Sequence, residues 1–275
     1  MNTTPYVYDL FLDEQLTLEE AFGFEDFKIN GLIQGTPLLH KAVAANRLRV
    51  VQSLLSHPQI DLYQTDLDGQ SALGLAAQKK RVPIFECLLK HPQMNTDDVF
   101  DKNVIPLHIA YQGNVKLAKL WTTYVGASAW EVEGDYYQAL FSLHYYGSNI
   151  SPLDIALHSG HQEMIQYLVE HTTLEPSSWL MERELMPPRH ESSHLPHPAI
   201  ILCSACPDLD TIGFLEQMKE SVKRGKPLHS SIIAEQCHIL FERKRLHDRL
   251  QDDIAQALTH SSETNTTGTK SGRRL

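Results

Sequence analysis

Residues 68–89 read DGQSALGLAAQKKRVPIFECLL, and the pattern of this stretch recurs along the chain. The segments LLHKAVAANRLRVVQSLL and IPLHIAYQGNVKLAKLW place His40 and His108 in the position of Gly74, at steps of 34 residues. A fourth segment, SPLDIALHSGHQEMIQYLV, places Asp154 in that position after a step of 46 residues. The sequence therefore contains at least four related units, and about a dozen extra residues precede the fourth.

Each unit has the residue spacing of two short amphipathic helices. In the second unit Leu73, Ala76 and Ala77 lie at i, i+3 and i+4, and the second half of the unit repeats this apolar spacing. Thr36-Pro37 and Ser151-Pro152 each predict a capping oxygen followed by a proline at the first helical position. One unit cannot bury its apolar face alone, so the units are predicted to stack.

Two further residues mark where helices begin and end. Pro83 is predicted to begin a second helix, where a proline costs no hydrogen bond. Gly160 is predicted to adopt the left-handed conformation that ends a first helix.

The period of the units and the segments TPLLHKA and IPLHIA resemble the ankyrin repeat, whose unit has roughly 33 residues and the signature T-P-L-H-x-A. The resemblance covers residues 31–171 and extends loosely to residue 218, where Pro198–Leu215 is a candidate for a fifth, degenerate unit. It implies an all-α fold, an ankyrin-repeat solenoid of four to five helix-pair units with helical caps at both ends. It also implies a structural role for His40 and His108, whose rings are expected to hydrogen-bond backbone in the adjacent connection.

The predicted organisation divides the chain into five segments. They are an acidic helical N-terminal cap over residues 1–30, ankyrin repeats 1–4 over residues 31–171 with an aromatic insertion at 126–147, an irregular loop and degenerate fifth repeat over residues 172–218, a C-terminal helical cap over residues 219–258, and a disordered tail over residues 259–275.

Three of these segments have two interpretations each. The first 30 residues carry seven acidic side chains and one lysine among aromatic residues, and they either cover the open end of the stack or bind a partner. The aromatic insertion either docks on the stack or contacts a partner. In the C-terminal helix, Arg243-Lys244-Arg245 is either a solvated helix face or a patch for nucleic acid or membrane.

Composition limits the class of protein. The net charge of −10 argues against nucleic-acid binding in general, because such proteins cluster Lys and Arg against phosphates. No apolar run reaches the roughly 20 residues that span a bilayer, and MNTTPYVYDL lacks the features of a secretion signal. Four cysteines in 275 residues do not resemble a secreted disulfide framework. A cytoplasmic protein is therefore expected. Its oligomeric state is left open, with a monomer favoured.

The sequence offers one candidate for metal chemistry. The side chains of His190, His194, His197, Cys203 and Cys206 are of zinc-ligating types, and the cysteines have C-x-x-C spacing. No second half-site follows in an established spacing, and both cysteines fall in the apolar run AIILCSAC. No nucleophile motif or phosphate-binding loop occurs. We expect no catalysis, no cofactor and no metal, and the alternative is an enzyme with a metal or thiol site in residues 172–258.

The ankyrin resemblance implies a concave surface that binds another protein. It places the binding positions just before the turn between the two helices of a unit and at the tips of the connections. Carried onto this sequence, these positions are Ala44, Ala45, Tyr63, Gln64, Asp66, Gln78, Lys79, Asp101, Asn103, Gln112, His158 and Ser159.

A narrower hypothesis concerns where the protein acts. The irregular repeats, the caps and the Ser- and Thr-rich tail ending in Arg-Arg-Leu resemble ankyrin proteins that intracellular bacterial pathogens deliver into host cells. That resemblance implies a secreted effector acting on a host protein in the host-cell cytoplasm.

Overall fold

The computed structural model describes residues 4–99, 101–132, 151–176, 201–202, 205–206, 242–251, 253–254 and 256. The chain divides into two compact units, Met1–Ser177 and Ser178–Leu275, and each is considered by itself. Among the described residues, no helix has both the length and the apolar character needed to span a membrane.

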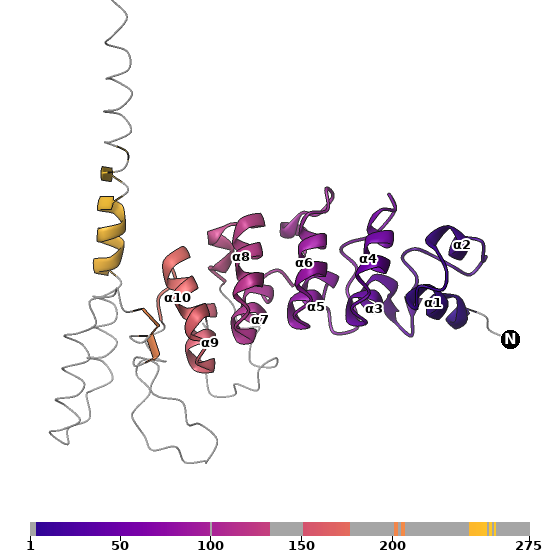
Figure 1. The fold of residues 1–275 in the computed structure, drawn as a ribbon, viewed down its shortest axis with the longest axis horizontal. Coiled ribbons are helices and arrows are strands. Elements are labelled where there is room, and N and C mark those ends of the chain that lie inside the picture. Colours follow the sequence, from indigo (N-terminus) through magenta and orange to yellow (C-terminus); the bar gives the residue numbers. More distant parts are fainter. Residues whose placement is uncertain are drawn as a thin grey trace, which may run out of the picture. The chain divides into compact units, whose positions relative to one another are not determined.

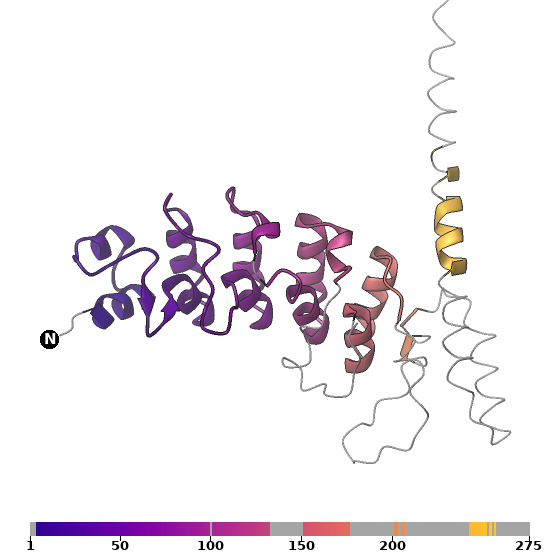
Figure 2. The same cartoon turned by 180° about the vertical axis from the view of Figure 1, so that it is seen from behind.

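The first unit is an array of helix pairs (Figure 1). Its helices are α3 (Leu38–Ala44), α4 (Leu48–Leu55), α5 (Ala72–Gln78), α6 (Val82–Leu89), α7 (Ile105–Gln112), α8 (Val115–Tyr124), α9 (Pro152–Ser159) and α10 (Gln162–His171). Helices α3, α5, α7 and α9 pack side by side in one row, and α4, α6, α8 and α10 form a second row, as the view from behind also shows (Figure 2). The predicted all-α solenoid is confirmed.

Small side chains allow the first row to pack closely. Ala42, Ala76, Ala110 and Ala156 are fully buried, one in each helix of this row. Because alanine has the shortest apolar side chain, it lets the backbones of neighbouring helices approach. The helices of the second row contribute larger buried residues, including Trp121 of α8. The two rows therefore share one continuous core.

Additional elements begin the array. They are α1 (Thr4–Leu12), α2 (Leu18–Phe22), β1 (Leu32–Ile33) and β2 (Thr36–Pro37), with the short 3-10 helices η1 (Thr96–Asp98) and η2 (Ala127–Trp130) further along. Helix α1 packs against α3. Phe27 is buried, and its ring contacts Tyr8, Phe11 and Phe22 at centroid distances of 5.2–5.5 Å. These aromatic contacts give the N-terminal helices a core of their own, which joins the first pair of the array.

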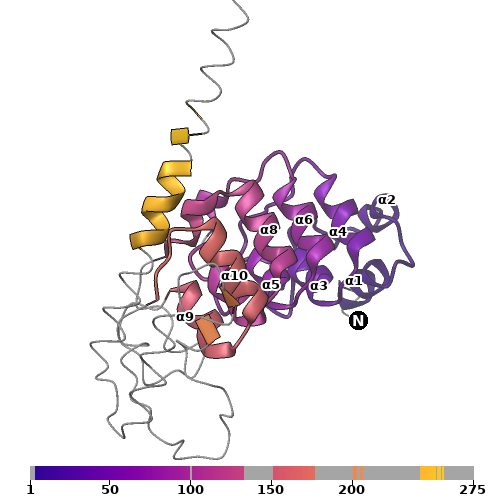
Figure 3. The same ribbon diagram turned by 60° about the vertical axis from the view of Figure 1, so that its left-hand side comes forward.

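The turns inside the four pairs share one backbone conformation. Asn46, Lys80, Gly113 and Gly160 have φ angles of 58°, 57°, 64° and 71°, which lie in the left-handed region. In each turn the following residue donates its N–H to a carbonyl five residues earlier, as Arg81 does to Ala76 at 2.8 Å. The prediction for Gly160 is confirmed. Four equal turns hold the two helices of every pair in the same relative position, and Figure 3 shows the pairs one behind another.

Helix starts agree with the sequence in two units and differ in a third. Ser151 caps α9 as predicted, with its Oγ accepting from Asp154 N at 3.1 Å, and Pro83 lies in the first turn of α6. The prediction for Thr36-Pro37 is wrong. These residues form β2, which pairs with β1, and α3 begins after Pro37 without a side-chain cap. The first N–H of α3, that of Leu38, donates instead to Gly31 O at 2.9 Å.

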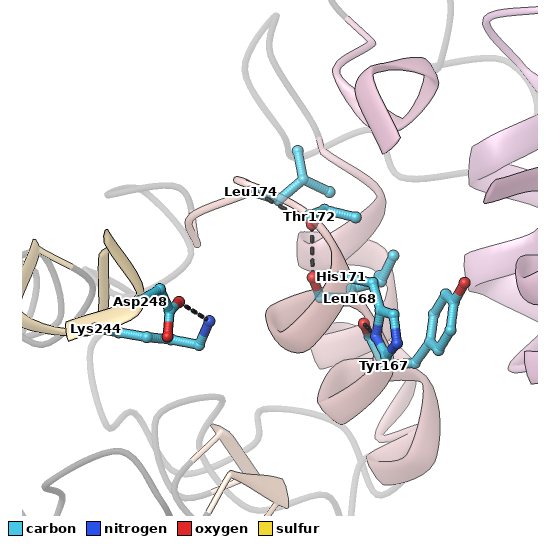
Figure 4. Close-up of polar contacts among 7 residues, drawn as sticks. All are labelled: Tyr167, Leu168, His171, Thr172, Leu174, Lys244 and Asp248. Carbon is cyan, nitrogen blue, oxygen red and sulfur yellow. Dashed lines mark hydrogen bonds and ion pairs between the residues drawn. The ribbon is translucent and has the colours of Figure 1, made fainter. Parts of the chain in front are cut away.

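Several predicted segments lie outside the described residues. They include most of the aromatic insertion, the loop after residue 176, most of the degenerate fifth repeat and the tail at 259–275. Of the C-terminal helix, residues 242–251, 253–254 and 256 are described, and they are helical. Lys244 and Asp248 form an i,i+4 ion pair there at 2.8 Å (Figure 4).

Candidate functional site

The ends of the first-row helices form the surface where partner contacts are predicted. We call residues 44–47, 78–81, 111–114 and 158–161 the turn surface. Ala44, Ala45 and Lys79 are exposed there, whereas Gln78, Gln112, His158 and Ser159 are half-buried. The predicted positions that come just before the turns therefore all lie at one end of the helix rows.

Side chains join each turn to the preceding one. Arg81 Nη2 donates to Ala44 O at 3.5 Å, and Gln112 Nε2 donates to Gln78 O at 3.2 Å. His161 Nε2 lies 2.9 Å from Tyr111 O. In each case the acceptor is a carbonyl at the end of a first-row helix, which has no partner within its own helix. The bonds hold neighbouring turns in a fixed relation before any partner arrives.

Gly113 leaves room for the contact between the His161 ring and Tyr111 O. A Cβ at this position would lie 2.6–2.9 Å from ring atoms of His161. Its φ of 64° also favours glycine. Gly113 therefore lets the His161 ring reach the carbonyl of Tyr111.

The opposite edge of the array is formed by the connections between pairs. We call residues 57–70 and 91–104 the connection edge. Both connections begin with His-Pro-Gln, and in both the histidine Nδ1 accepts from the glutamine N–H, at 3.2 Å for His57 and Gln59 and at 3.2 Å for His91 and Gln93. The repeated tripeptide is therefore a turn motif.

One side chain joins each connection to the preceding one. Tyr63 Oη donates to Gln93 O at 2.7 Å and accepts from Asn95 N at 2.9 Å. One unit earlier, Asn30 Nδ2 donates to Gln59 O at 2.8 Å, and its Oδ1 accepts from Asp61 N at 2.9 Å. The same two backbone positions are bound in both steps, by a phenol in one and an amide in the other.

The predicted tip residues have structural roles in these connections. The Asp66 carboxylate accepts from the N–H groups of Asp68 and Gln70 at 3.0 and 2.9 Å, which shapes the turn. Gln64 Nε2 donates to Asn30 O at 3.3 Å. Asn103 is exposed. A partner role for these residues stays a prediction.

The prediction that Asp101 lies at an exposed tip is wrong. Asp101 is buried, and its Oδ2 accepts from Ser71 N at 3.2 Å. Gly74 creates the space, because a Cβ there would lie 1.8 Å from Asp101 Oδ2. Burial raises the pKa of the Asp101 carboxyl, and hydrogen bonds from Ser71 oppose that rise. A glycine in the position of the motif histidine thus admits a carboxylate from the next connection.

The two motif histidines are buried. His40 Nε2 lies 2.9 Å from Gln70 O, which is the predicted contact with the adjacent connection. Burial lowers the pKa of His40, and burial lowers the pKa of His108 to about 4. Both rings are therefore neutral near pH 7 and form part of the core.

A family model described as ankyrin repeats, in three copies, matches residues 39–130. Residues 39–130 are therefore ankyrin repeats. Ankyrin repeats are in general modules for protein–protein interaction. Among curated proteins, none matches this chain.

Solved structures include an ankyrin protein that is similar to this chain. The crystal structure of EF0377, an ankyrin repeat protein, is 16% identical to it, with a TM-score of 0.47. The match covers 60% of this chain and 79% of that chain.

Some exposed residues of the ankyrin array had not been predicted as binding positions. Tyr111 is 49% exposed at the end of α7, beside Gln112, and Leu67 is 83% exposed on the connection edge. Lys80 is exposed in the turn after Lys79. The position of Lys80 in the repeat could have indicated this, because it directly follows the predicted residues 78 and 79. In this turn the left-handed residue Gly113 lies 33 residues after Lys80, one residue short of the 34-residue step of the repeat.

The last described helix pair of the array, α9 and α10, is fixed by side-chain contacts (Figure 4). The rings of Tyr167 and His171 stack at a centroid distance of 4.4 Å, and Thr172 Oγ1 donates to Leu168 O at 2.6 Å. The Tyr167 hydroxyl donates to Thr122 Oγ1 of α8 at 2.9 Å. Helix α10 is therefore tied to α8.

The described residues contain no group of three or more His, Cys, Asp or Glu side chains that could hold a metal ion. Of the zinc candidates, only Cys206 is described, and it is buried. His190, His194, His197 and Cys203 lie outside the described residues. The metal or thiol alternative for residues 172–258 therefore stays untested.

Proposed function

We propose that the array is a non-catalytic scaffold that recognises a partner protein across the turn surface. The observation that supports this most is the series of bonds between turns, from Arg81 to Ala44, Gln112 to Gln78 and His161 to Tyr111. A surface that is ordered before binding loses little conformational entropy when a partner docks. The described residues of this surface combine such order with exposed side chains.

The size of the array is adequate for this role. A stable interface needs about 800 Å² from each partner. The turn surface crosses four consecutive pairs, from α3–α4 to α9–α10. Exposed Tyr111 supplies an aromatic side chain of the type that is enriched at binding hot spots.

The test is affinity capture from cell lysate with two matched variants of the full chain. The first carries Ala44→Arg, Lys79→Ala and Tyr111→Ala on the turn surface. The second carries Gln52→Arg, Lys119→Ala and Tyr124→Ala, which are exposed residues of α4 and α8. Gln112 is left intact, because its side chain binds Gln78 O and its loss would weaken the stack itself.

The proposal expects a partner that binds the wild type and the second variant and is lost from the first. Circular dichroism melts establish that both variants are folded. A partner retained by all three proteins would place the interface elsewhere and contradict the proposal. Absence of any partner would favour the enzyme alternative.

A further inference from the structure

Charge is distributed unevenly across the ankyrin array. No Asp or Glu occurs in residues 27–60, 69–85 or 102–130, which include the first three turns. The carboxylates of this part of the chain lie mainly on the connection edge or next to it. The turn surface and the first residues of the second-row helices carry cations instead, namely Arg47, Arg49, Lys79, Lys80, Arg81 and Lys116. Arg47 and Arg49 already pair with Asp13 and Glu14, at 3.0 and 3.8 Å.

The lysines on the two sides differ in their ion pairs. Lys90 at the end of α6 pairs with Glu86, and Lys102 on the connection edge pairs with Asp97 at 3.0 Å. Within the described part of the chain, Lys79, Lys80 and Lys116 have neither an ion pair nor a side-chain hydrogen bond, and all three are exposed. Their charges are therefore available to another molecule.

The backbone of Lys80 gives a second reason to assign a role to this charge. Its φ of 57° is a conformation that side-chain-bearing residues rarely adopt. The third and fourth pairs place Gly113 and Gly160 in the equivalent turn position. Strained residues are found preferentially where function requires the side chain. Lys80 therefore keeps a charged side chain at a position where glycine would be unstrained.

We propose that the partner segment bound by the turn surface is acidic, and that it runs over the turns of the second and third pairs. This inference rests on the proposed function and names the chemistry of the partner. Carboxylates of the segment pair with Lys79, Lys80 and Lys116, and Tyr111 packs against an apolar side chain of the segment. The bond from Gln112 Nε2 to Gln78 O shows that these two turns are neighbours in space.

The net charge of the chain favours an acidic protein segment over nucleic acid. At −10, the protein as a whole repels a long polyanion. A short acidic peptide can contact the second and third turns without reaching Asp13 and Glu14, which pair with Arg47 and Arg49 beside the first turn. The test below therefore also measures binding to nucleic acid.

The test measures binding of the full chain to a fluorescein-labelled 20-residue poly-glutamate peptide by anisotropy. A poly-glutamine peptide and a 20-nucleotide single-stranded DNA of random sequence serve as comparison probes. One variant carries Lys79→Glu, Lys80→Glu and Lys116→Glu. The control carries Lys28→Glu, Lys90→Glu and Lys102→Glu, which changes the net charge equally at three other described positions.

The proposal expects the glutamate peptide to bind more tightly than the glutamine peptide, with affinity falling as salt rises. It expects at least a tenfold loss in the turn variant and less than a threefold loss in the control. Equal losses in both variants, no binding, or tighter binding of the DNA would overturn it. If the lysate partner still depends on the turn surface while the charge variant binds it normally, the acidic partner is rejected and the scaffold function stands.

Discussion

At the scale of single residues, Gly74 and Asp101 illustrate how one unit departs from its repeat. The first and third units have histidine in the position of Gly74, and both histidines are buried. In the second unit the Asp101 carboxylate lies where a Cβ on Gly74 would be. The position thus stays filled, with the side chain supplied by the next connection.

Gly74→Ala should destabilise the protein by about 2 kcal/mol, because the added Cβ forces the buried carboxylate to move. Asp101→Gly should also destabilise it, because Ser71 N loses its acceptor. In the double variant the clash is gone, so its loss should be smaller than the sum of the single losses by about 1 kcal/mol or more. Urea unfolding of all four proteins measures this coupling, and additive losses would contradict the assigned contact.

His108 should make stability depend on pH. Burial lowers its pKa to about 4 from 6.5, so the unfolded chain binds the proton at higher pH than the folded chain. The contribution is complete above about pH 6.5 and is lost as pH falls toward 4, with a full difference on the order of 3 kcal/mol. Urea unfolding between pH 7 and 4.5 checks the slope.

His108→Gln is the comparison for that slope, and it should flatten the dependence over this range. His40 acts in the same direction as His108, because its pKa is also lowered. Asp101 acts in the opposite direction, because a raised carboxyl pKa lets the folded chain bind the proton first. An unchanged slope in the variant would show that His108 is not buried in its neutral form.

At the scale of secondary-structure elements, the turn inside each helix pair has a conformation that recurs in all four pairs. All four turns use a left-handed residue, and two of the four use glycine. Lys80→Gly should therefore stabilise the protein by about 1 kcal/mol, since the left-handed conformation costs a non-glycine residue about 1–2 kcal/mol. Lys79→Gly is the control, because φ of Lys79 is −88° and glycine should destabilise there. Thermal unfolding distinguishes the two, and equal changes would contradict strain at Lys80.

The connections offer a second element-scale prediction. Tyr63→Phe removes the hydroxyl that binds both Gln93 O and Asn95 N. The loss should be about 1 kcal/mol, because both backbone groups must then find water. Tyr6→Phe is the matched control, since Tyr6 is 65% exposed and its hydroxyl has no hydrogen bond among the described residues. If both variants melt alike, Tyr63 does not join the connections in solution.

The sequence predicted the elements better than the contacts between them. The period located the helices, and Ser151 and Gly160 marked ends that depend only on local backbone chemistry. The prediction at Thr36-Pro37 was wrong because Thr-Pro is compatible both with a strand pair and with the capped start of a helix. The burial of Asp101 and the bonds of Tyr63 join residues about 30 positions apart, so no local pattern revealed them. The predicted turn positions remain candidates, to which the structure adds Lys80 and Tyr111.

At the scale of the first unit, the array separates two edges with different chemistry. Tyr63 and Asp66 organise the connection edge, and the bonds of Arg81, Gln112 and His161 organise the turn surface. Lys79, Lys80 and Lys116, which have no ion pair among the described residues, lie on the turn side, and the proposed function places the partner there. The hypothesis of delivery into host cells depends on residues 259–275, which lie outside the described residues. Deletion of those residues should abolish delivery and leave thermal unfolding unchanged, and normal delivery would reject it.

Amide hydrogen exchange of the full chain, alone and with its captured partner, tests the central claim most directly. The account predicts slower exchange on binding in peptides that cover residues 44–47, 78–81 and 111–114, with little change in residues 61–70 and 95–103. Protection confined to those connection residues, or to residues 172–258, would contradict it.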